Sequence, residues 1–324
     1  VISDLTEEKL AGHLFDSLRN KIMPLPDHLI VYPNHGAGSA CGKMMSDETT
    51  DTLGNQKKVN YALRADMTKE EFKKELLTGL TAPPGYFPQN VLMNIKGYES
   101  LDKVMNKGMN PLDPQAFELV ADESGALVLD TRDPEDFAKG FIPNSVNIGL
   151  DGNYAQWVGE MIPSVQQEIL LVTYPGKEEE AITRLSRVGY DNTIGLLEGG
   201  FDAWKQAGKD FETVDRITVK ELEAQLETGA PLVIDVRKKS EFDSEHVISA
   251  MNVPLNQINE HLSSFPKDKP FILHCAGGYR SMIASSILKQ RGWTNFVDVI
   301  GGFDEIKENS TIKRSEYRCP TTLL

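Results

Sequence analysis

The sequence predicts an α/β protein with two tandem domains, each a parallel sheet covered by helices on both faces. Three observations predict this fold class. Short apolar runs rich in β-branched residues alternate with amphipathic stretches, the same order of runs occurs twice, and 324 residues are too many for one ordinary domain. The first 110 residues do not join the repeat and are expected to form a separate N-terminal portion with its linker.

The repeat is carried by identical residues about 100 positions apart. It pairs Asp130, Arg132, Phe137 and Asn147 with Asp235, Arg237, Phe242 and Asn252, and Gly199-Gly200-Phe201-Asp202 with Gly301-Gly302-Phe303-Asp304. A period this long indicates tandem globular domains, because stacked solenoid repeats have periods of roughly 20–50 residues. We therefore place one domain at 111–211 and a second at 212–312, followed by a tail at 313–324.

Each repeat has the order strand, helix, strand, helix, strand. The predicted strands are 126–129 and 169–172 in the first repeat, and 231–234 and 271–273 in the second. These runs are apolar at nearly every position, which is typical of strands buried on both faces of a parallel sheet. Between them lie amphipathic stretches such as 282–291, which are expected to be the covering helices.

The N-terminal 110 residues contain fewer recognisable elements. We expect a helix at 7–19, a short strand at 29–32, a loop rich in Gly and Ser at 34–42, and a helix at 69–77 with Thr68 as its N-cap. The proline-rich stretch 81–88 is predicted to be irregular, because proline disfavours regular structure at and before its own position. It is expected to lead into the repeat.

Composition excludes some classes of function. The net charge of −14 argues against nucleic acid as a partner, because phosphate binding needs clustered Lys and Arg. No apolar run approaches the roughly 20 residues that a membrane-spanning helix requires. Three widely separated cysteines do not suit a disulfide framework, and the N-terminus shows no signal peptide. We therefore expect a reducing, cytoplasmic location.

Cys275 stands out among the three cysteines. It ends an apolar run and is followed by Ala276, two glycines, Tyr279, Arg280 and Ser281, where the next helix is expected to begin. Three features would favour an anion there: the positive end of the helix dipole, the Arg280 cation, and backbone N–H groups that Gly277 and Gly278 allow to point inward. We therefore expect a lowered thiol pKa and a resting thiolate nucleophile. Cys41 and Cys319 lack this setting and are expected to be incidental thiols.

The order of motifs in 111–312 resembles a tandem of rhodanese domains, and Cys275 to Ser281 match the CxxGxRS active loop of that family. Asp235-x-Arg237, Glu241-Phe242 and Gly301-Gly302-Phe303 follow in the order that the family has. The resemblance implies a cysteine persulfide that takes sulfur from a small sulfane-sulfur donor. It implies a thiol, sulfite or cyanide as the acceptor.

The resemblance also assigns roles to individual residues. Cys275 and Arg280 are the expected catalytic residues, and the expected substrate-binding residues are Ala276, Gly277, Gly278, Tyr279 and Ser281. Asp235 and Arg237 are expected to brace the loop. The family's usual Gly-His-Ile is replaced here by Glu245-His246-Val247, and its Gly-Ala by Ser249-Ala250, neither of which lies in the loop.

Alternatives to sulfur transfer remain open at this point. A tyrosine-phosphatase-like Cys-x5-Arg loop is disfavoured, because only four residues separate Cys275 from Arg280. A non-catalytic docking or sulfur-sensing module is the main rival. In the first repeat the corresponding loop, 172–180, contains no cysteine and has three glutamates at the helix start, so we expect a degenerate domain with a structural or docking role.

Residues 25–42 resemble the C-terminal end of a metallo-β-lactamase fold of the kind fused to rhodanese domains, with Pro33-Asn34-His35 in place of a Pro-Gly-His. The HxHxDH metal cluster of that fold is absent from these residues. The resemblance therefore implies an incomplete portion of that αββα fold, with no cofactor and no metal site in this fragment.

We expect this chain to be the C-terminal fragment of a longer fusion protein. In the intact protein the resemblance implies iron or zinc, and a persulfide at Cys275 could be exchanged with a dioxygenase centre upstream. A glyoxalase II-like hydrolase is the second alternative for that intact protein, and it would need the missing metal ligands. A homo-oligomer is compatible with the sequence.

Overall fold

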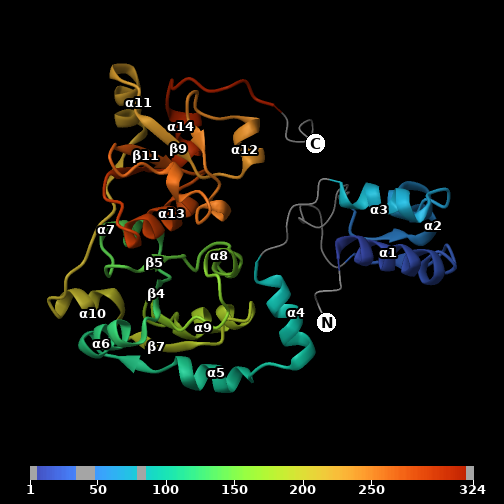
Figure 1. The fold of residues 1–324 in the computed structure, drawn as a ribbon, viewed down its shortest axis with the longest axis horizontal. Coiled ribbons are helices and arrows are strands. Elements are labelled where there is room, and N and C mark those ends of the chain that lie inside the picture. Colours follow the sequence, from blue (N-terminus) through green and yellow to red (C-terminus); the bar gives the residue numbers. More distant parts are fainter. Residues whose placement is uncertain (1–5, 34–47, 79–84, 319–324) are drawn as a thin grey trace. The chain divides into compact units, whose positions relative to one another are not determined.

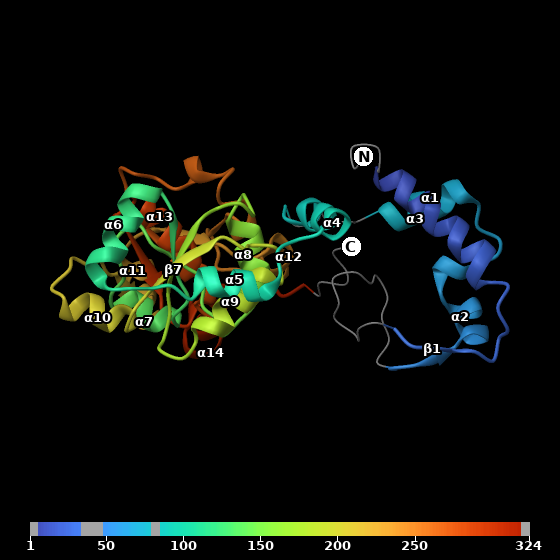
Figure 2. The ribbon, with the colours of Figure 1, turned by 90° about the horizontal axis from the view of Figure 1, so that it is seen from below.

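The computed structural model describes residues 6–33, 48–78 and 85–318, and the chain divides into two compact units at residue 82. The N-terminal unit has helices α1 (Glu7–Ser17), α2 (Leu53–Val59) and α3 (Lys69–Leu77), with a π-helical turn at Leu18–Ile22 and a short 3-10 helix at Tyr61–Leu63. Strands β1 (Ile30–Val31) and β2 (Asp51–Thr52) pair in antiparallel fashion. Helices α1 and α3 lie side by side (Figures 1 and 2).

Local sequence explains these elements. The predicted helix at 69–77 is confirmed, and the Thr68 hydroxyl and the Glu71 carboxylate form a reciprocal capping box at its start. The helix predicted at 7–19 ends at Ser17 as an α-helix but continues as the π-helical turn. Its packing against α3 is fixed by an edge-to-face contact between Phe15 and Phe72, whose ring centroids are 5.4 Å apart.

The second unit contains two five-stranded sheets in which every pairing is parallel. The first sheet has the order β3-β7-β6-β4-β5 and the second has the order β8-β12-β11-β9-β10. The strands of the first domain are β3 (Pro111–Leu112), β4 (Leu127–Asp130), β5 (Val146–Asn147), β6 (Ile169–Val172) and β7 (Thr193–Leu197). Those of the second are β8 (Arg216–Ile217), β9 (Leu232–Asp235), β10 (Met251–Asn252), β11 (Phe271–His274) and β12 (Phe296–Val299). The predicted α/β class with tandem parallel sheets is confirmed.

Helices connect and cover these strands. Helices α4 (Phe87–Lys96) and α5 (Leu101–Gly108) precede the first sheet, and its own helices are α6 (Pro114–Ser124), α7 (Pro134–Lys139), α8 (Tyr154–Met161), α9 (Glu178–Ser186) and α10 (Gly200–Gln206). The second domain has α11 (Val219–Thr228), α12 (Lys239–Ser244), α13 (Tyr279–Gln290) and α14 (Gly302–Asn309), with short 3-10 helices at Leu255–Gln257 and Leu262–Ser264. The prediction of irregular structure to residue 88 is wrong at its end, because α4 starts at Phe87 and its first turn accommodates Pro88.

Alternate residues of the central strands face different cores. In the first sheet Leu170 belongs to a core with α6 and α10, whereas Leu171 belongs to the core that also contains α9. In the second sheet Ile272 packs with α11 and α14, whereas Leu273 packs with α13. Both faces of each sheet are therefore covered, as expected for near-continuous apolar strands.

One hydrophobic core is shared by both domains. It includes Leu171 of the first sheet and Leu273 of the second, together with apolar residues of α8, α9 and α13. Helix α13 contacts β5 and α7 of the first domain, and Figure 1 shows it lying where the two domains meet. The Ser286 hydroxyl of α13 accepts a hydrogen bond of 3.0 Å from the Asn147 N–H of β5. The helix that follows Cys275 therefore carries the interface between the domains.

Candidate active site

Cys275 directly follows β11 and lies four residues before α13 begins at Tyr279. Its side chain is buried, with 1% of the residue exposed. Gly278 caps the helix with a φ of 102°, a left-handed conformation that an L-residue rarely adopts, and its N–H points at the sulfur with an N···Sγ distance of 3.2 Å. The turn therefore presents a backbone donor to Sγ, as the two glycines predicted.

A second glycine brings α14 against the same loop. Gly302 has a φ of 56°, and a Cβ there would lie 2.6 Å from the Cys275 carbonyl oxygen. This close approach lets the Phe303 N–H donate a hydrogen bond of 2.8 Å to that oxygen, and the Asp304 N–H donates one of 3.0 Å to the Ala276 oxygen. The Gly-Gly-Phe-Asp motif at 301–304 therefore fixes the backbone of the cysteine loop by hydrogen bonds to its carbonyl oxygens.

Cys275 opens onto a cavity of about 610 Å³. Of the residues predicted to bind substrate, Ala276, Gly277 and Tyr279 line this cavity, as do both predicted catalytic residues. Gly278 and Ser281 do not line it. The Ser281 side chain is buried beneath the loop, where its hydroxyl donates a hydrogen bond of 3.1 Å to the Gly278 oxygen.

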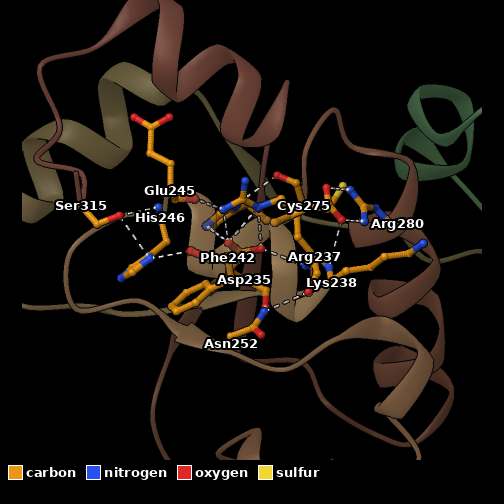
Figure 3. A network of polar contacts seen from close by, with 12 residues as sticks. Asp235, Arg237, Lys238, Phe242, Glu245, His246, Asn252, Cys275, Arg280 and Ser315 are labelled. Carbon is orange, nitrogen blue, oxygen red and sulfur yellow. Dashed lines mark hydrogen bonds and ion pairs between the residues drawn. The ribbon is translucent and has the colours of Figure 1, made fainter. Parts of the chain in front are cut away.

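Arg280 is not the free cation that the sequence suggests. Its guanidinium donates two hydrogen bonds, of 2.6 and 2.8 Å, to the carboxylate of Glu241 on α12. Burial opposes both charges, yet this bidentate pair holds the pKa of Glu241 below its usual value and that of Arg280 above it. Figure 3 shows Arg280 beside Cys275. The positive charge near the sulfur is therefore largely balanced.

The expected lowering of the Cys275 pKa is contradicted. Burial raises the pKa of the thiol, and this effect outweighs the opposing influence of the Ser281 hydrogen bonds and of Arg280. The buried carboxylate of Asp298 on β12 raises it further. The surroundings of Cys275 therefore favour the neutral thiol over the thiolate.

Asp298 belongs to a buried ion pair behind the loop. Arg216 of β8 donates a hydrogen bond of 3.0 Å from Nε to Asp298 and one of 2.5 Å from a terminal nitrogen to Glu135 of the first domain. Burial raises the pKa of Asp298 to about 6, although Ser281 and Arg216 oppose the rise. At the corresponding register positions of the first sheet stand Leu196 and Pro111. The charged pair is therefore present only in the domain that carries the cysteine.

Asp235 and Arg237 lie at the centre of the polar network in Figure 3. Arg237 forms a buried bidentate pair with Asp235, with a shortest distance of 2.6 Å, and donates a hydrogen bond of 2.8 Å to the Glu245 oxygen. The Asn252 amide joins the segment by donating to the carbonyl oxygens of both residues, at 2.9 Å each. Neither residue lines the cavity. The first domain repeats the same pair as Asp130 and Arg132.

The sequence model of the rhodanese-like domain matches residues 113–207 and 218–309, more than half of the chain. The chain belongs to the rhodanese-like family. Its two repeats are thus two rhodanese-like domains in tandem.

Individual relatives share shorter stretches. YqhL of Bacillus subtilis is 37% identical over 71 residues, which are 22% of this chain and 56% of that protein. MoeZ of Mycobacterium tuberculosis, named as a probable adenylyltransferase/sulfurtransferase, is 37% identical over 118 residues, which are 36% of this chain and 28% of that one. A metallo-β-lactamase structure from Staphylococcus aureus is 28% identical with a TM-score of 0.46, covering 60% of this chain and 52% of that one. The matched part of this chain covers between 28% and 56% of the length of these proteins.

The second rhodanese-like domain does not form the cavity alone. Besides the cysteine loop, the second domain contributes Lys238 and Glu241, and the first rhodanese-like domain completes the cavity with Asp151, Gly152, Asn153, Gln156 and Trp157. Sequence reasoning missed the residues at 151–157, because they lie more than 110 positions before Cys275 and match no motif. The packing of α13 against β5 and α7 brings them near the loop.

In the first rhodanese-like domain Thr173 stands where the second has Cys275. Val172 pairs with Asp130 as His274 pairs with Asp235, so the next residues, Thr173 and Cys275, correspond. The turn is also alike, because Gly176 has a φ of 87°. Glu178 then begins α9 where Arg280 stands in α13. The first domain thus keeps the backbone of the loop and lacks its thiol and its arginine.

Other residues singled out from the sequence lie apart from the site. His35, Cys41 and Cys319 fall outside the described residues. In the described ranges no three His, Cys, Asp or Glu side chains form a group suited to a metal ion. Across those same ranges no helix combines the length and apolar character needed to cross a membrane.

His274, the residue before Cys275, is fully buried. Burial lowers its pKa, and its Nδ1–H donates a hydrogen bond to the Cys275 carbonyl oxygen.

Proposed function

We propose that this chain is a sulfurtransferase in which Cys275 carries sulfur as a persulfide. The observation that supports this best is the position of the sulfur: Sγ accepts the Gly278 N–H at 3.2 Å and opens onto a cavity of about 610 Å³. A thiol that lined no cavity would meet no donor. The sulfurtransferase name of MoeZ is in line with the proposal.

The proposed transfer has two steps. The Cys275 thiol first loses its proton, and the thiolate attacks the outer sulfur of a donor, so that a new S–S bond forms while the donor's own S–S bond breaks. The leaving sulfur keeps the electron pair of the broken bond and departs as a thiolate, or as sulfite when thiosulfate is the donor. An acceptor thiolate, sulfite or cyanide then attacks the outer sulfur of the persulfide and restores the Cys275 thiolate.

The residues of the loop act on the charge that develops. The Gly278 N–H donates to the sulfur when it is anionic, and Arg280, although paired with Glu241, remains within electrostatic range of it. Since the thiol pKa is raised at rest, this stabilisation is needed most after substrate binding displaces water from the cavity. The reaction is an exchange between sulfur atoms and calls for no cofactor.

Mass spectrometry of the reduced chain tests the proposal. After brief exposure to thiosulfate or to glutathione persulfide, we expect one added sulfur atom on Cys275 and its loss when cyanide or a thiol is added. Cys275→Ser should carry no adduct at that position and should lower turnover by at least about 1,000-fold. An adduct that forms but does not pass to any acceptor would instead favour a sulfur-sensing module.

A further inference from the structure

The wall that the first rhodanese-like domain contributes to the Cys275 cavity is held in place from two sides. From the second domain, the Tyr279 hydroxyl donates a hydrogen bond of 2.7 Å to the Gly149 carbonyl oxygen. From the first domain, Arg184 of α9 donates hydrogen bonds of 2.6 Å to the Leu150 carbonyl oxygen and 3.1 Å to that of Gly152. The segment that leads into α8 is therefore fixed at the site by a side chain of α9 and by one of the cysteine loop.

Close packing adds to this fixation. A Cβ placed on Gly152 would lie only 2.7 Å from the Tyr279 ring, so the ring of the cysteine loop rests directly on the backbone of the wall. Trp157 is 7% exposed and belongs to the shared core, while its neighbours Asn153 and Gln156 are exposed. The exposed amide side chains of Asn153 and Gln156 therefore line the cavity next to the buried Trp157.

The charges that line the cavity balance one another. Asp151 and Glu241 are acidic, Lys238 and Arg280 are basic, and Arg280 is already paired with Glu241. Within the described ranges neither Asp151 nor Lys238 forms an ion pair, so one carboxylate and one ammonium group of the lining have no ion-pair partner. Lys177 lies within electrostatic reach of Asp151. Lys238 also lies within electrostatic reach of Glu160 on α8. Figure 3 shows the Lys238 side chain extending beside Arg280.

This balance does not favour a small inorganic dianion. Thiosulfate would meet as many carboxylates as cations and would fill only a small part of about 610 Å³, a volume in the range that organic ligands occupy. A molecule that carries separate ammonium and carboxylate groups matches Asp151 and Lys238. Its uncharged part can contact the rings of Trp157 and Tyr279.

We infer that residues 151–157 of the first rhodanese-like domain form a specificity wall, which selects a zwitterionic organic thiol or persulfide over thiosulfate at Cys275. The inference rests on the proposed function. Cys275 thiolate attacks the outer sulfur of the organic persulfide, the bond between its two sulfurs breaks, and the organic thiolate leaves with the electron pair and takes up a proton. The first domain does no chemistry in this scheme and decides which molecule reaches the sulfur.

Steady-state sulfur transfer by the full chain from two donors, cysteine persulfide and thiosulfate, tests the wall. We expect Gln156→Ala and Asp151→Asn each to lower kcat/KM for cysteine persulfide by about 10-fold and for thiosulfate by less than about 3-fold. Both side chains are exposed, so folding should be preserved. Lys139→Ala, an exposed position of the same domain outside this cavity, is the matched control and should change neither value.

A charge reversal gives the sharpest outcome. Asp151→Lys places a further cation in the cavity, so kcat/KM for thiosulfate should rise by about 5-fold while that for cysteine persulfide falls. Equal losses with both donors, or no loss with either, would overturn the specificity wall even though Cys275 still acquires sulfur. Failure of the proposed function itself would look different, because the wild-type chain would then form no persulfide with either donor.

Discussion

At the scale of single residues, the sulfur of Cys275 is governed by groups that pull its pKa in opposite directions. Burial and the Asp298 carboxylate favour the neutral thiol, whereas Ser281 and Arg280 favour the thiolate. Because burial is the largest of these effects, the pKa of the thiol is raised. Thiolate-dependent reactions of the free protein should therefore accelerate with pH beyond the range of an ordinary cysteine.

Asp298→Asn tests this electrostatic account. The pKa of Asp298 is raised to about 6, so above that pH the wild-type side chain is charged and disfavours the thiolate. Removing the charge should lower the pKa of Cys275 and shift the pH profile of its alkylation by iodoacetamide toward lower pH. Asp243→Asn, which changes a carboxylate on α12 that pairs with Lys239, should leave the profile in place. A shift toward higher pH in Asp298→Asn would contradict the assignment.

Glu241→Gln addresses the paired state of Arg280. The amide can still accept one hydrogen bond from the guanidinium but no longer neutralises it, so the positive charge acts on the sulfur. We expect alkylation of Cys275 to become several-fold faster near neutral pH, with the fold retained by circular dichroism. An unchanged rate would mean that the ion pair has no influence on the thiol.

At the scale of elements, the two loops that follow β6 and β11 share a backbone and differ in chemistry. Thr173 occupies the cysteine position, yet α9 begins with Glu178, Glu179 and Glu180, which suit the helix dipole and repel an anion. A thiol placed in the first loop would lack the arginine of the second. The first loop therefore differs from the second in the charge at the helix start as well as in the missing thiol.

The double variant T173C/C275S should accordingly remain inactive. We expect turnover to stay at the level of Cys275→Ser, and mass spectrometry to find no sulfur adduct at position 173 after exposure to thiosulfate. The glutamates at the start of α9 are the physical reason, since they raise the free energy of a thiolate there. A persulfide at position 173 would show that the loop backbone alone is sufficient.

Features that depend on neighbouring residues in the chain could be predicted from sequence, whereas features that depend on distant residues could not. The strand before Cys275, the Thr68 cap and the glycine turn follow from local patterns and were found. The pairing of Arg280 with Glu241 and the rise in the Cys275 pKa were not, because they depend on burial and on a neighbour 39 residues away. The wall at 151–157 was invisible for the same reason, since a contact between domains leaves no periodicity in the chain.

At the scale of the whole second unit, a core common to both domains should make them unfold together. Leu170→Ala removes a buried side chain from the core that belongs to the first domain alone and should cost about 2–5 kcal/mol. We expect the denaturant midpoint for exposure of Cys275, followed by thiol labelling, to fall along with the midpoint of tryptophan fluorescence. A Cys275 midpoint that stays in place while the fluorescence midpoint falls would mean that the domains unfold independently.

Arg184 and Tyr279 hold the 149–153 segment at the edge of the Cys275 cavity, and this segment belongs to the domain that has no thiol at the corresponding position. Under the inferred role of the wall, donor choice and sulfur exchange are therefore divided between the two domains. Substitutions at 151–157 would then change which molecules reach Cys275 while leaving the loop at 275–281 intact.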